Sequence, residues 1–386
     1  MLCHGKVKFK KEIFMQKINI AVIGCGSRGR RVVSSFLSAA DGKASVCCVY
    51  DPSAEAVSIA QGTWQDQEFR IAGSMEEAVS SRDVDMVAIF SPNAFHCEAI
   101  LAALAHGKKV FSEKPLATTL EDCEKIIAAE KRSGISIMTG FVLRYSPLYR
   151  KVKELLAGGT FGKIINISAS ENRETFGGGA SMSSSMGWRR LRSMSGPYLL
   201  EKCSHDLDLL NWFAGGVPEK VSAFCGLNFF VPENGYMHDK YDHDIFASLV
   251  EEKYRIDPFT SSKDIFDNHS VIMEYASGIR ASFQLTLANA IPERRMYISC
   301  TEGTIIVECF SGVITYSRLD EPYVTTLKFK GRNTHGGGDE IMAEEVMKAV
   351  LEGKSMAVSG SANGLDCARV ALAADESALT GKTVSL

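Results

Sequence analysis

Residues 18–29 read INIAVIGCGSRG. The first part of this stretch is a mostly apolar, β-branched run, which is typical of a strand buried on both faces of a sheet. The run passes directly into a glycine-rich turn, and the helical pattern RRVVSSFLSAA follows at residues 30–40. A strand, a glycine-rich turn and a helix in this order predict the first unit of a dinucleotide-binding domain.

The glycine-rich turn has the spacing GxGxxG, and each glycine meets a separate need. Gly24 permits the tight turn, Gly26 lets the backbone approach a pyrophosphate, and Gly29 lets the helix pack closely on the strand. The start of the helix, at Ser27 and Arg28, offers unpaired N–H groups and the positive end of the helix dipole to the phosphates. We therefore predict that these residues bind a dinucleotide.

The next predicted strand, residues 44–50, ends just before Asp51, which follows the last glycine of the motif by 22 residues. A carboxylate at this place accepts hydrogen bonds from the ribose hydroxyls of the adenosine and repels a 2′-phosphate. Arg28, Arg30 and Arg31 lie close by in the sequence and keep NADP as a second choice. We predict NAD as the cofactor, with NADP less favoured.

Further apolar runs predict strands at residues 69–73, 84–92, 108–115 and 135–141, and helical patterns separate them. This alternation predicts a doubly wound parallel sheet, whose ligands lie at the carboxyl ends of the strands. The residues expected at these ends, close to the cofactor, are Ser91, Pro92, Asn93, Glu113 and Lys114. Because Pro115 favours extended geometry in the residue before it, Lys114 is expected to project from the rim towards the nicotinamide.

The helix predicted at residues 197–215, PYLLEKCSHDLDLLNWFAG, has ionisable residues along one line. Glu201, His205 and Asp208 stand at i, i+4 and i+7, which places them on one stripe, with Lys202 beside it. Taken alone, this pattern favours a solvated helix face with local ion pairs. Zinc would need a third ligand, and no HExxH motif or cysteine pair supplies one. No metal site is therefore predicted.

Length and charge narrow the class of protein. A chain of 386 residues exceeds the size of one ordinary core, so two domains are expected. The net charge of −3 provides no electrostatic footprint for nucleic acid or for an anionic membrane. No stretch reaches the roughly 18 apolar residues that a membrane-spanning helix needs. These features predict a soluble globular protein without a nucleic-acid or membrane partner.

The cysteines and the first residues indicate the compartment. The eleven cysteines are scattered without a CxxC pair, which favours a reducing cytosol over a disulfide framework. The lysine-rich start loosely resembles a signal peptide, but its apolar run of about seven residues continues into the glycine motif. We expect a cytoplasmic protein with a flexible arm at residues 1–16, in which Met15 is an alternative start.

Several motifs of the first half together resemble the Gfo/Idh/MocA oxidoreductases (glucose–fructose oxidoreductase, inositol dehydrogenase, rhizopine catabolism). They are GCGSRG with Asp51, SPN at residues 91–93 and SEKPLATT at residues 112–119, of which EKP is the most specific. The likeness covers residues 17–386. It implies a small carbohydrate or cyclitol as substrate, a Rossmann domain at residues 17–141 and an α+β domain at residues 142–386.

The resemblance also implies that the second domain has a large, mostly antiparallel open sheet and forms a homodimer or homotetramer through it. The second half of the sequence fits a sheet of this kind independently, because β-rich runs occur at residues 162–173, 269–287, 294–309 and 312–318. Two helical patterns close the chain, and Asp339 is expected to cap the first of them.

In that family the second domain supplies a helix that reads roughly D-x-G-x-H-x-x-D, whose acid and histidine work beside the EKP lysine. In this sequence Glu201 stands at the first acid, His205 at the histidine and Asp208 at the last acid, whereas Cys203 replaces the glycine and Lys202 is an added cation. The resemblance therefore implies Lys114, Glu201 and His205 as catalytic residues. Lys202, which the family pattern lacks, is added as a further catalytic candidate.

Alcohol oxidation requires that a proton leave the hydroxyl as the hydride leaves the carbon. Histidine suits the proton transfer because its ordinary pKa lies near 6.5. Lys114 can hydrogen-bond the same hydroxyl and stabilise developing negative charge. Glu201, one helical turn from His205, is expected to hold the ring, favour the imidazolium and raise the pKa of His205.

Other substrate contacts are expected next to the cleft. The glycine- and serine-rich stretch 174–196 is predicted to be a lid or a plain surface loop, in which Trp188 stacks on a sugar and Arg189 holds an anionic group. Residues 232–267 look like an insertion without an assigned role. The remaining candidates are Tyr145, Asp208 and His335.

Three functions are compatible with these motifs. The first is an NAD-dependent dehydrogenase of a sugar, amino sugar or cyclitol. The second is a redox-neutral glycosidase or lyase, in which transient oxidation of a sugar carbon acidifies the neighbouring proton, elimination follows, and the hydride is returned. The third is a regulator that binds NAD without turnover, against which Lys114 and His205 together argue.

Overall fold

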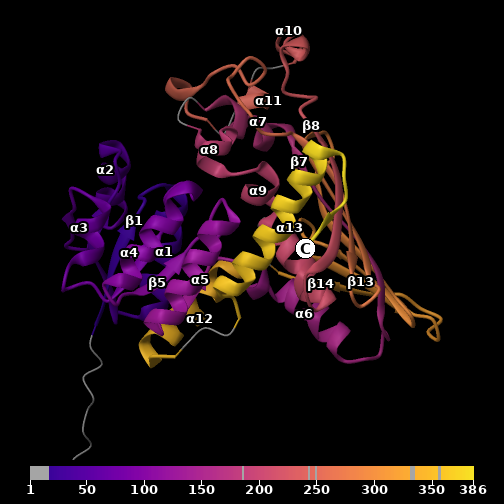
Figure 1. Ribbon diagram of the computed structural model, residues 1–386, viewed down its shortest axis with the longest axis horizontal. Coiled ribbons are helices and arrows are strands. Elements are labelled where there is room, and N and C mark those ends of the chain that lie inside the picture. Colours follow the sequence, from indigo (N-terminus) through magenta and orange to yellow (C-terminus); the bar gives the residue numbers. More distant parts are fainter. Residues whose placement is uncertain (1–16, 185–186, 242–243, 248–249, 331–334, 355–357) are drawn as a thin grey trace, which may run out of the picture.

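Two β-sheets, each covered by helices, form the molecule (Figure 1). The computed structural model describes residues 17–184, 187–241, 244–247, 250–330, 335–354 and 358–386. The predicted arm at residues 1–16, with Met15, lies outside these described residues. No described helix has both the length and the apolar character needed to cross a membrane.

The first sheet is parallel throughout and has the strand order β3-β2-β1-β4-β5-β6. This confirms the predicted doubly wound fold. Its strands are β1 (Ile18–Ile23), β2 (Ala44–Tyr50), β3 (Arg70–Ile71), β4 (Met86–Ile89), β5 (Lys109–Ser112) and β6 (Ile137–Thr139). Its helices are α1 (Ser27–Ala40), α2 (Ala54–Thr63), α3 (Met75–Ser80), α4 (His96–Ala105) and α5 (Leu120–Ser133), with short turns of helix η1 (Asn93–Phe95) and η2 (Val142–Tyr145).

The parallel arrangement follows from strands that are apolar on both faces. All four residues of β4 are fully buried, and so are Ile20, Ala21 and Val22 of β1. Such strands need helices on both sides of the sheet, which is the arrangement that βαβ connections give. The carboxyl ends of β1, β2, β4 and β5 therefore meet at one rim, where a ligand is expected.

The second sheet has the strand order β14-β13-β12-β11-β7-β10-β9-β8-β15 and is antiparallel except between β7 and β10. This confirms the predicted α+β half. Its strands are β7 (Ile164–Glu174), β8 (Pro218–Gly226), β9 (Asn268–Tyr275), β10 (Arg280–Asn289), β11 (Glu293–Cys300), β12 (Gly303–Glu308), β13 (Val313–Arg318), β14 (Thr325–Lys328) and β15 (Val384–Ser385). The sequence did not predict β8, β14 or β15.

The helical elements of this half include several in stretches that were expected to be irregular. The prediction of a loop over residues 174–196 was wrong, because α7, η3 and α8 lie there. The elements are α6 (Pro147–Ala157), α7 (Thr175–Ser183), η3 (Trp188–Arg190), α8 (Arg192–Ser195), α9 (Tyr198–Ala214), η4 (Pro232–Asn234), α10 (Met237–Lys240), α11 (Asp244–Ala247), η5 (Glu252–Tyr254), α12 (Gly338–Glu352) and α13 (Ser361–Thr380).

The last two helices return to the first half of the chain. Apolar residues of α12, among them Met342 and Val346, belong to the same buried cluster as Phe36 of α1. Helix α13 packs against α5, α9 and β8 and so joins the two halves (Figure 1). Asp339 lies in the first turn of α12 behind the capping residue Gly337, so the expected capping role was wrong.

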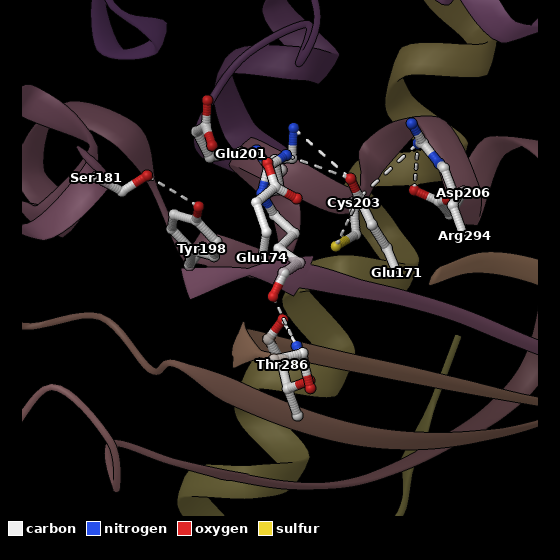
Figure 2. A network of polar contacts seen from close by, with 12 residues as sticks. Glu171, Glu174, Ser181, Tyr198, Glu201, Cys203, Asp206, Thr286 and Arg294 are labelled. Carbon is white, nitrogen blue, oxygen red and sulfur yellow. Dashed lines mark hydrogen bonds and ion pairs between the residues drawn. The ribbon is translucent and has the colours of Figure 1, made fainter. Parts of the chain in front are cut away.

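A buried network of charges fixes α9 to the second sheet (Figure 2). Arg294 of β11 donates two hydrogen bonds, of 2.8 and 2.6 Å, to the carboxylate of Asp206 on α9. Glu171 of β7 lies 3.9 Å from Arg294 and accepts a hydrogen bond from the thiol of Cys203. Glu171, Cys203 and Asp206 lie close enough together to hold a metal ion. However, Arg294 already neutralises the two carboxylates, and burial raises the pKa of the Cys203 thiol, which disfavours the thiolate that a metal would need.

Replacing Arg294 with methionine should destabilise the fold by about 3–5 kcal/mol, because it leaves buried carboxylates without their cation. Chemical denaturation of both proteins measures the difference. The matched control is Arg295→Met on the same strand, where the half-exposed pair with Glu308 should contribute less than about 1 kcal/mol. Equal losses in the two variants would contradict a role of the buried network in holding α9.

Candidate active site

A cavity of about 360 Å³ lies between the carboxyl rim of the first sheet and helix α9. Both halves of the chain contribute to its walls, and most of the predicted site residues meet there. From the first half come Arg28, Arg31, Phe90, Ser91, Asn93, His96, Glu113 and Lys114. From the second half come Arg173, Gly177, Ala180, Ser181, Trp188, Arg189, Tyr198, Glu201, Lys202, His205 and His335.

The glycine turn has room for a pyrophosphate at one position only. A Cβ atom on Gly24 would lie 2.6 Å from the carbonyl carbon of Phe90, and one on Gly29 would lie 2.4 Å from the carbonyl oxygen of Gly24. A Cβ atom on Gly26 would meet nothing within 4 Å. Packing therefore requires Gly24 and Gly29, whereas Gly26 faces open space beside the start of α1. This cradle fits a dinucleotide.

Asp51 is held at the end of β2 beside this cradle. Its carboxylate accepts hydrogen bonds from the backbone N–H groups of Cys25, at 2.7 Å, and Ser53, at 2.8 Å. The carboxylate is thus fixed next to the glycine turn, where a ribose would lie.

Arg28 links the glycine turn to two other parts of the site. Its Nε donates to Glu113 at 2.7 Å, and its Nη1 donates to Asp339 of α12 at 2.5 Å. Its Nη2 is buried and has no hydrogen-bond partner among the described residues. Arg28 therefore has a structural role between the domains and keeps one donor for a ligand.

Lys114 connects the rim of the first sheet to α9. Its Nζ donates a hydrogen bond to the backbone carbonyl of Glu201, and its backbone N–H donates to Glu113. Asn93 makes a second connection, because its amide donates to the carbonyl of Ser195 at 2.9 Å. Pro92 immediately precedes η1, which begins at Asn93.

The polar stripe of α9 is buried, with Glu201 and His205 both 4% exposed. One carboxylate oxygen of Glu201 accepts a hydrogen bond from Arg189 at 2.8 Å. The other oxygen, and Nδ1 of His205, have no partner among the described residues. Glu201 therefore does not hold the imidazole ring, which contacts the ring of His335 edge-on at 5.5 Å between centroids.

The expected direction of the pKa shift of His205 was wrong. Burial, and after it the positive charge of Lys114, lower the pKa of His205 well below 6.5. Burial alone would raise the pKa of Glu201, but Arg189, Lys114 and Lys202 outweigh it and lower that pKa. Near neutral pH the site thus holds a carboxylate and a neutral imidazole, which is the form that accepts a proton.

Tyr145 and Asp208 do not line the cavity, so the expected substrate contacts are corrected. Asp208 is buried and receives two hydrogen bonds, of 2.7 and 2.8 Å, from Arg144. Tyr145 is 1% exposed and packs in the apolar cluster that includes α12. Both residues have structural roles at the junction of the two halves.

The remaining predicted residues lie in the walls of the cavity. His335 pairs with Asp339 at 2.8 Å, and burial lowers its pKa. Arg189 lies over the ring of Trp188, 4.3 Å from the ring centroid. Nζ of Lys202 lies 3.6 Å from a carboxylate oxygen of Glu171, and burial lowers the pKa of Lys202 to about 8.

Sequence reasoning did not single out Arg173, Ser181 or Tyr198, which also line the cavity. Arg173 stands at the end of a predicted strand, immediately before a glycine-rich stretch, and that position was the available signal. Ser181 and Tyr198 share a hydrogen bond of 3.0 Å, and both come from apolar or small-residue patterns without such a signal (Figure 2).

Family models match both halves of the chain. Residues 18–141 match the model described as an oxidoreductase family with an NAD-binding Rossmann fold. Residues 149–306 match the model of the GFO/IDH/MocA C-terminal domain. An inositol 2-dehydrogenase of Burkholderia cenocepacia (strain HI2424) is 31% identical over 318 residues, which are 82% of this chain and 78% of that protein.

Other relatives have different named activities. The 2,7-anhydro-N-acetylneuraminate hydratase of Escherichia coli (strain K12) is 29% identical, over 75% of this chain and 68% of that protein. An uncharacterized oxidoreductase of Streptococcus pneumoniae is 31% identical, and the match spans about half of that relative, 53% of its length. The solved levoglucosan dehydrogenase, in complex with NADH and levoglucosan, shares the fold with a TM-score of 0.79 at 20% identity, over 96% of this chain and 99% of that one.

Cofactor choice should depend on Asp51. We expect NAD to bind more tightly than NADP, and Asp51→Ala to reduce this preference about tenfold or more, since a charge-assisted hydrogen bond to the ribose is lost and repulsion of a 2′-phosphate is removed. Titration of both cofactors measures the ratio. The exposed Asp66, replaced in the same way, should leave it unchanged. Tighter binding of NADP by the unmodified protein would show that this reading of Asp51 is wrong.

Proposed function

The chain belongs to the GFO/IDH/MocA oxidoreductase family, and we propose that it transfers a hydride between NAD and a secondary hydroxyl of a sugar, amino sugar or cyclitol. The observation that carries this proposal is that Lys114, on the rim of the Rossmann sheet, and His205, on α9, line one cavity. A substrate between them would have its hydroxyl beside both groups.

The cofactor fits the first half of the site. Gly26 and the start of α1 would hold the pyrophosphate, and Asp51 would bind the adenosine ribose. When bound there, NAD supplies the hydride acceptor at its nicotinamide. The chain has to place the substrate carbon next to that ring and to remove the hydroxyl proton.

His205 is the proposed general base. It is neutral near pH 7 because burial and Lys114 lower its pKa, so it can take the hydroxyl proton as the hydride leaves the carbon. Lys114 can donate a hydrogen bond to the same oxygen and stabilise its developing negative charge. The nearby carboxylate of Glu201 then offsets the charge of the imidazolium, and Lys202 completes the proposed catalytic set.

One observation favours a redox-neutral lyase or hydratase as the second candidate. His335, which pairs with Asp339, lines the same cavity as His205. Alcohol oxidation needs one base, whereas elimination or hydration next to the oxidised carbon needs a second acid or base. The hydratase of Escherichia coli among the relatives is consistent with such chemistry. A purely regulatory NAD-binding protein would not need Lys114 and His205 in one cavity.

The outer face of the second sheet supports assembly of the chain into a homodimer or homotetramer. Phe224, Ile272 and Tyr297 alternate with buried residues on β8, β9 and β11, and they are 82%, 62% and 37% exposed. Exposed apolar side chains gathered on one sheet face are typical of an interface. We also propose a reducing compartment, the cytoplasm, because no disulfide bond is present among the ten cysteines within the described residues.

The function is tested by mixing the NAD-loaded protein with a panel of sugars, amino sugars and cyclitols and recording the absorbance of NADH. A dehydrogenase should accumulate NADH in proportion to oxidised product. A lyase or hydratase should convert substrate while NADH stays at or below the concentration of the protein. If no member of the panel reduces NAD or is converted, the proposed chemistry is contradicted.

His205→Asn should lower turnover by roughly 10²–10⁴-fold, which is the usual contribution of a positioned base. NAD affinity and melting temperature should change little, because the helix belongs to the other half. The control is His106, a surface residue whose ring pairs with Glu76, and His106→Asn should keep the full rate. A normal rate in His205→Asn would show that His205 is not the general base and has only a structural role.

The same base predicts the pH dependence. An imidazolium cannot accept a proton, so turnover falls as the pH drops through the pKa of His205. Because that pKa lies well below 6.5 in the folded protein, the acid-side loss that His205 causes should begin below pH 6.5. The residual activity of His205→Asn should not show this loss of turnover at acid pH. A loss centred above pH 6.5 that disappears in the variant would contradict the buried, neutral imidazole.

A further inference from the structure

The walls of the cavity carry more positive than negative side chains. Six cations line it, Arg28, Arg31, Lys114, Arg173, Arg189 and Lys202, against the two carboxylates of Glu113 and Glu201. Those two carboxylates are already paired, Glu113 with Arg28 and Glu201 with Arg189. Lys114 donates to a backbone carbonyl. Among the cations contributed by the second half, Arg173 and Lys202 are left without a hydrogen-bond acceptor inside the cavity.

Arg173 lies near the end of β7, and its donors are poorly satisfied. Its guanidinium nitrogens are 3.5 Å from Glu171 and 3.6 Å from Glu174, which is beyond the usual hydrogen-bond distance. Its Nε is buried and has no hydrogen-bond partner within the part of the chain that the structure describes. Gly177 lets the guanidinium pack against its backbone, because a Cβ atom there would lie 2.7 Å from Nη2. The guanidinium thus borders the cavity, and none of its nitrogens has a carboxylate oxygen of the described residues within the usual hydrogen-bond distance.

Lys202 shares the same distant carboxylate. Its Nζ is 3.6 Å from Glu171, the same oxygen that Arg173 approaches, and it makes no hydrogen bond to any described residue. Glu171 is 1% exposed, also faces Arg294 (Figure 2), and does not line the cavity. Burial lowers the pKa of Lys202 to about 8. Arg173 and Lys114 add to this effect and Glu171 opposes it. A bound anion would stabilise the charged form of Lys202 and reduce the repulsion between these cations.

We propose that Arg173 and Lys202 bind an oxyanion of the substrate, and that the substrate is a sugar acid held by its carboxylate. A guanidinium fork matches the planar carboxylate, and an ammonium adds a further charge-assisted hydrogen bond. This inference rests on the proposed function, because it places the sugar ring in the cavity with His205 and Lys114. A phosphate ester offers similar oxyanion chemistry and is separated from the carboxylate by the test.

Calorimetric titration of the NAD-saturated protein compares three sugar acids with their methyl esters, which differ only in the charged group. The probes are D-glucuronate, D-galacturonate and N-acetylneuraminate, with D-galactose 6-phosphate as the phosphate arm. At least one acid should bind about ten- to a hundredfold more tightly than its ester, as expected for hydrogen bonds to a charged group. The carboxylate assignment is overturned if every acid binds no better than its ester, or if the phosphate binds most tightly.

Variants locate the subsite. Lys202→Met and Arg173→Met should each remove about tenfold or more of the affinity for the acid and leave the affinity for the ester and for NAD unchanged. If Arg173→Met does not fold, Lys202→Arg is the second test. It keeps the positive charge and should retain the affinity for the acid that Lys202→Met loses. The matched control is Arg295→Met, which removes one positive charge outside the cavity. Equal weakening by the control, or a loss of NAD affinity in the cavity variants, would overturn the assignment.

Binding and turnover fail separately in this design. If acids bind through Arg173 and Lys202, but no sugar, amino sugar, cyclitol or sugar acid reduces NAD or is converted, the proposed function is contradicted and the subsite is left intact. A neutral sugar that reduces NAD, while every acid binds no better than its ester, would contradict the subsite and leave the proposed function intact.

Discussion

Two buried arginines hold helix α9 in place, and the site depends on them. Arg294 of the second sheet binds Asp206, and Arg144, at the end of the first half, binds Asp208. Charged groups are buried only when they are paired, so each pair fixes the rotation of the helix against one neighbour. With these two acids turned away and neutralised, Glu201 and His205 are left to face the rim of the Rossmann sheet.

The charges around the cavity then set the chemistry of the base. An exposed helix with the same stripe would have an ordinary histidine beside a carboxylate. Here burial and Lys114 keep His205 neutral, while Arg189 forms an ion pair with the carboxylate of Glu201. A neutral base and a nearby carboxylate are what proton removal from an alcohol requires. The same positive surroundings would favour the proposed anionic substrate, so the proposed base and the proposed substrate choice would have a common electrostatic origin.

The sequence was sufficient for the parts of the fold that depend on local pattern. The glycine turn, the alternation of strands and helices, and the EKP motif predicted the Rossmann sheet and the position of Lys114. The roles of Asp208 and Tyr145 could not be read in this way, because they depend on Arg144 and on α12, which are distant in the chain. The direction of the pKa shift of His205 depends first on its burial and then on Lys114, a residue of the other half, and helical periodicity reveals neither.

The central claim is that the cofactor and the substrate meet between Lys114 and His205. A crystal structure of the protein with NAD tests it most directly. We expect the pyrophosphate against Gly26, a ribose on Asp51, and the nicotinamide ring in the cavity, within contact of Lys114 and facing His205. A nicotinamide that lies outside this cavity, or on the far side of α9 from His205, would contradict the account.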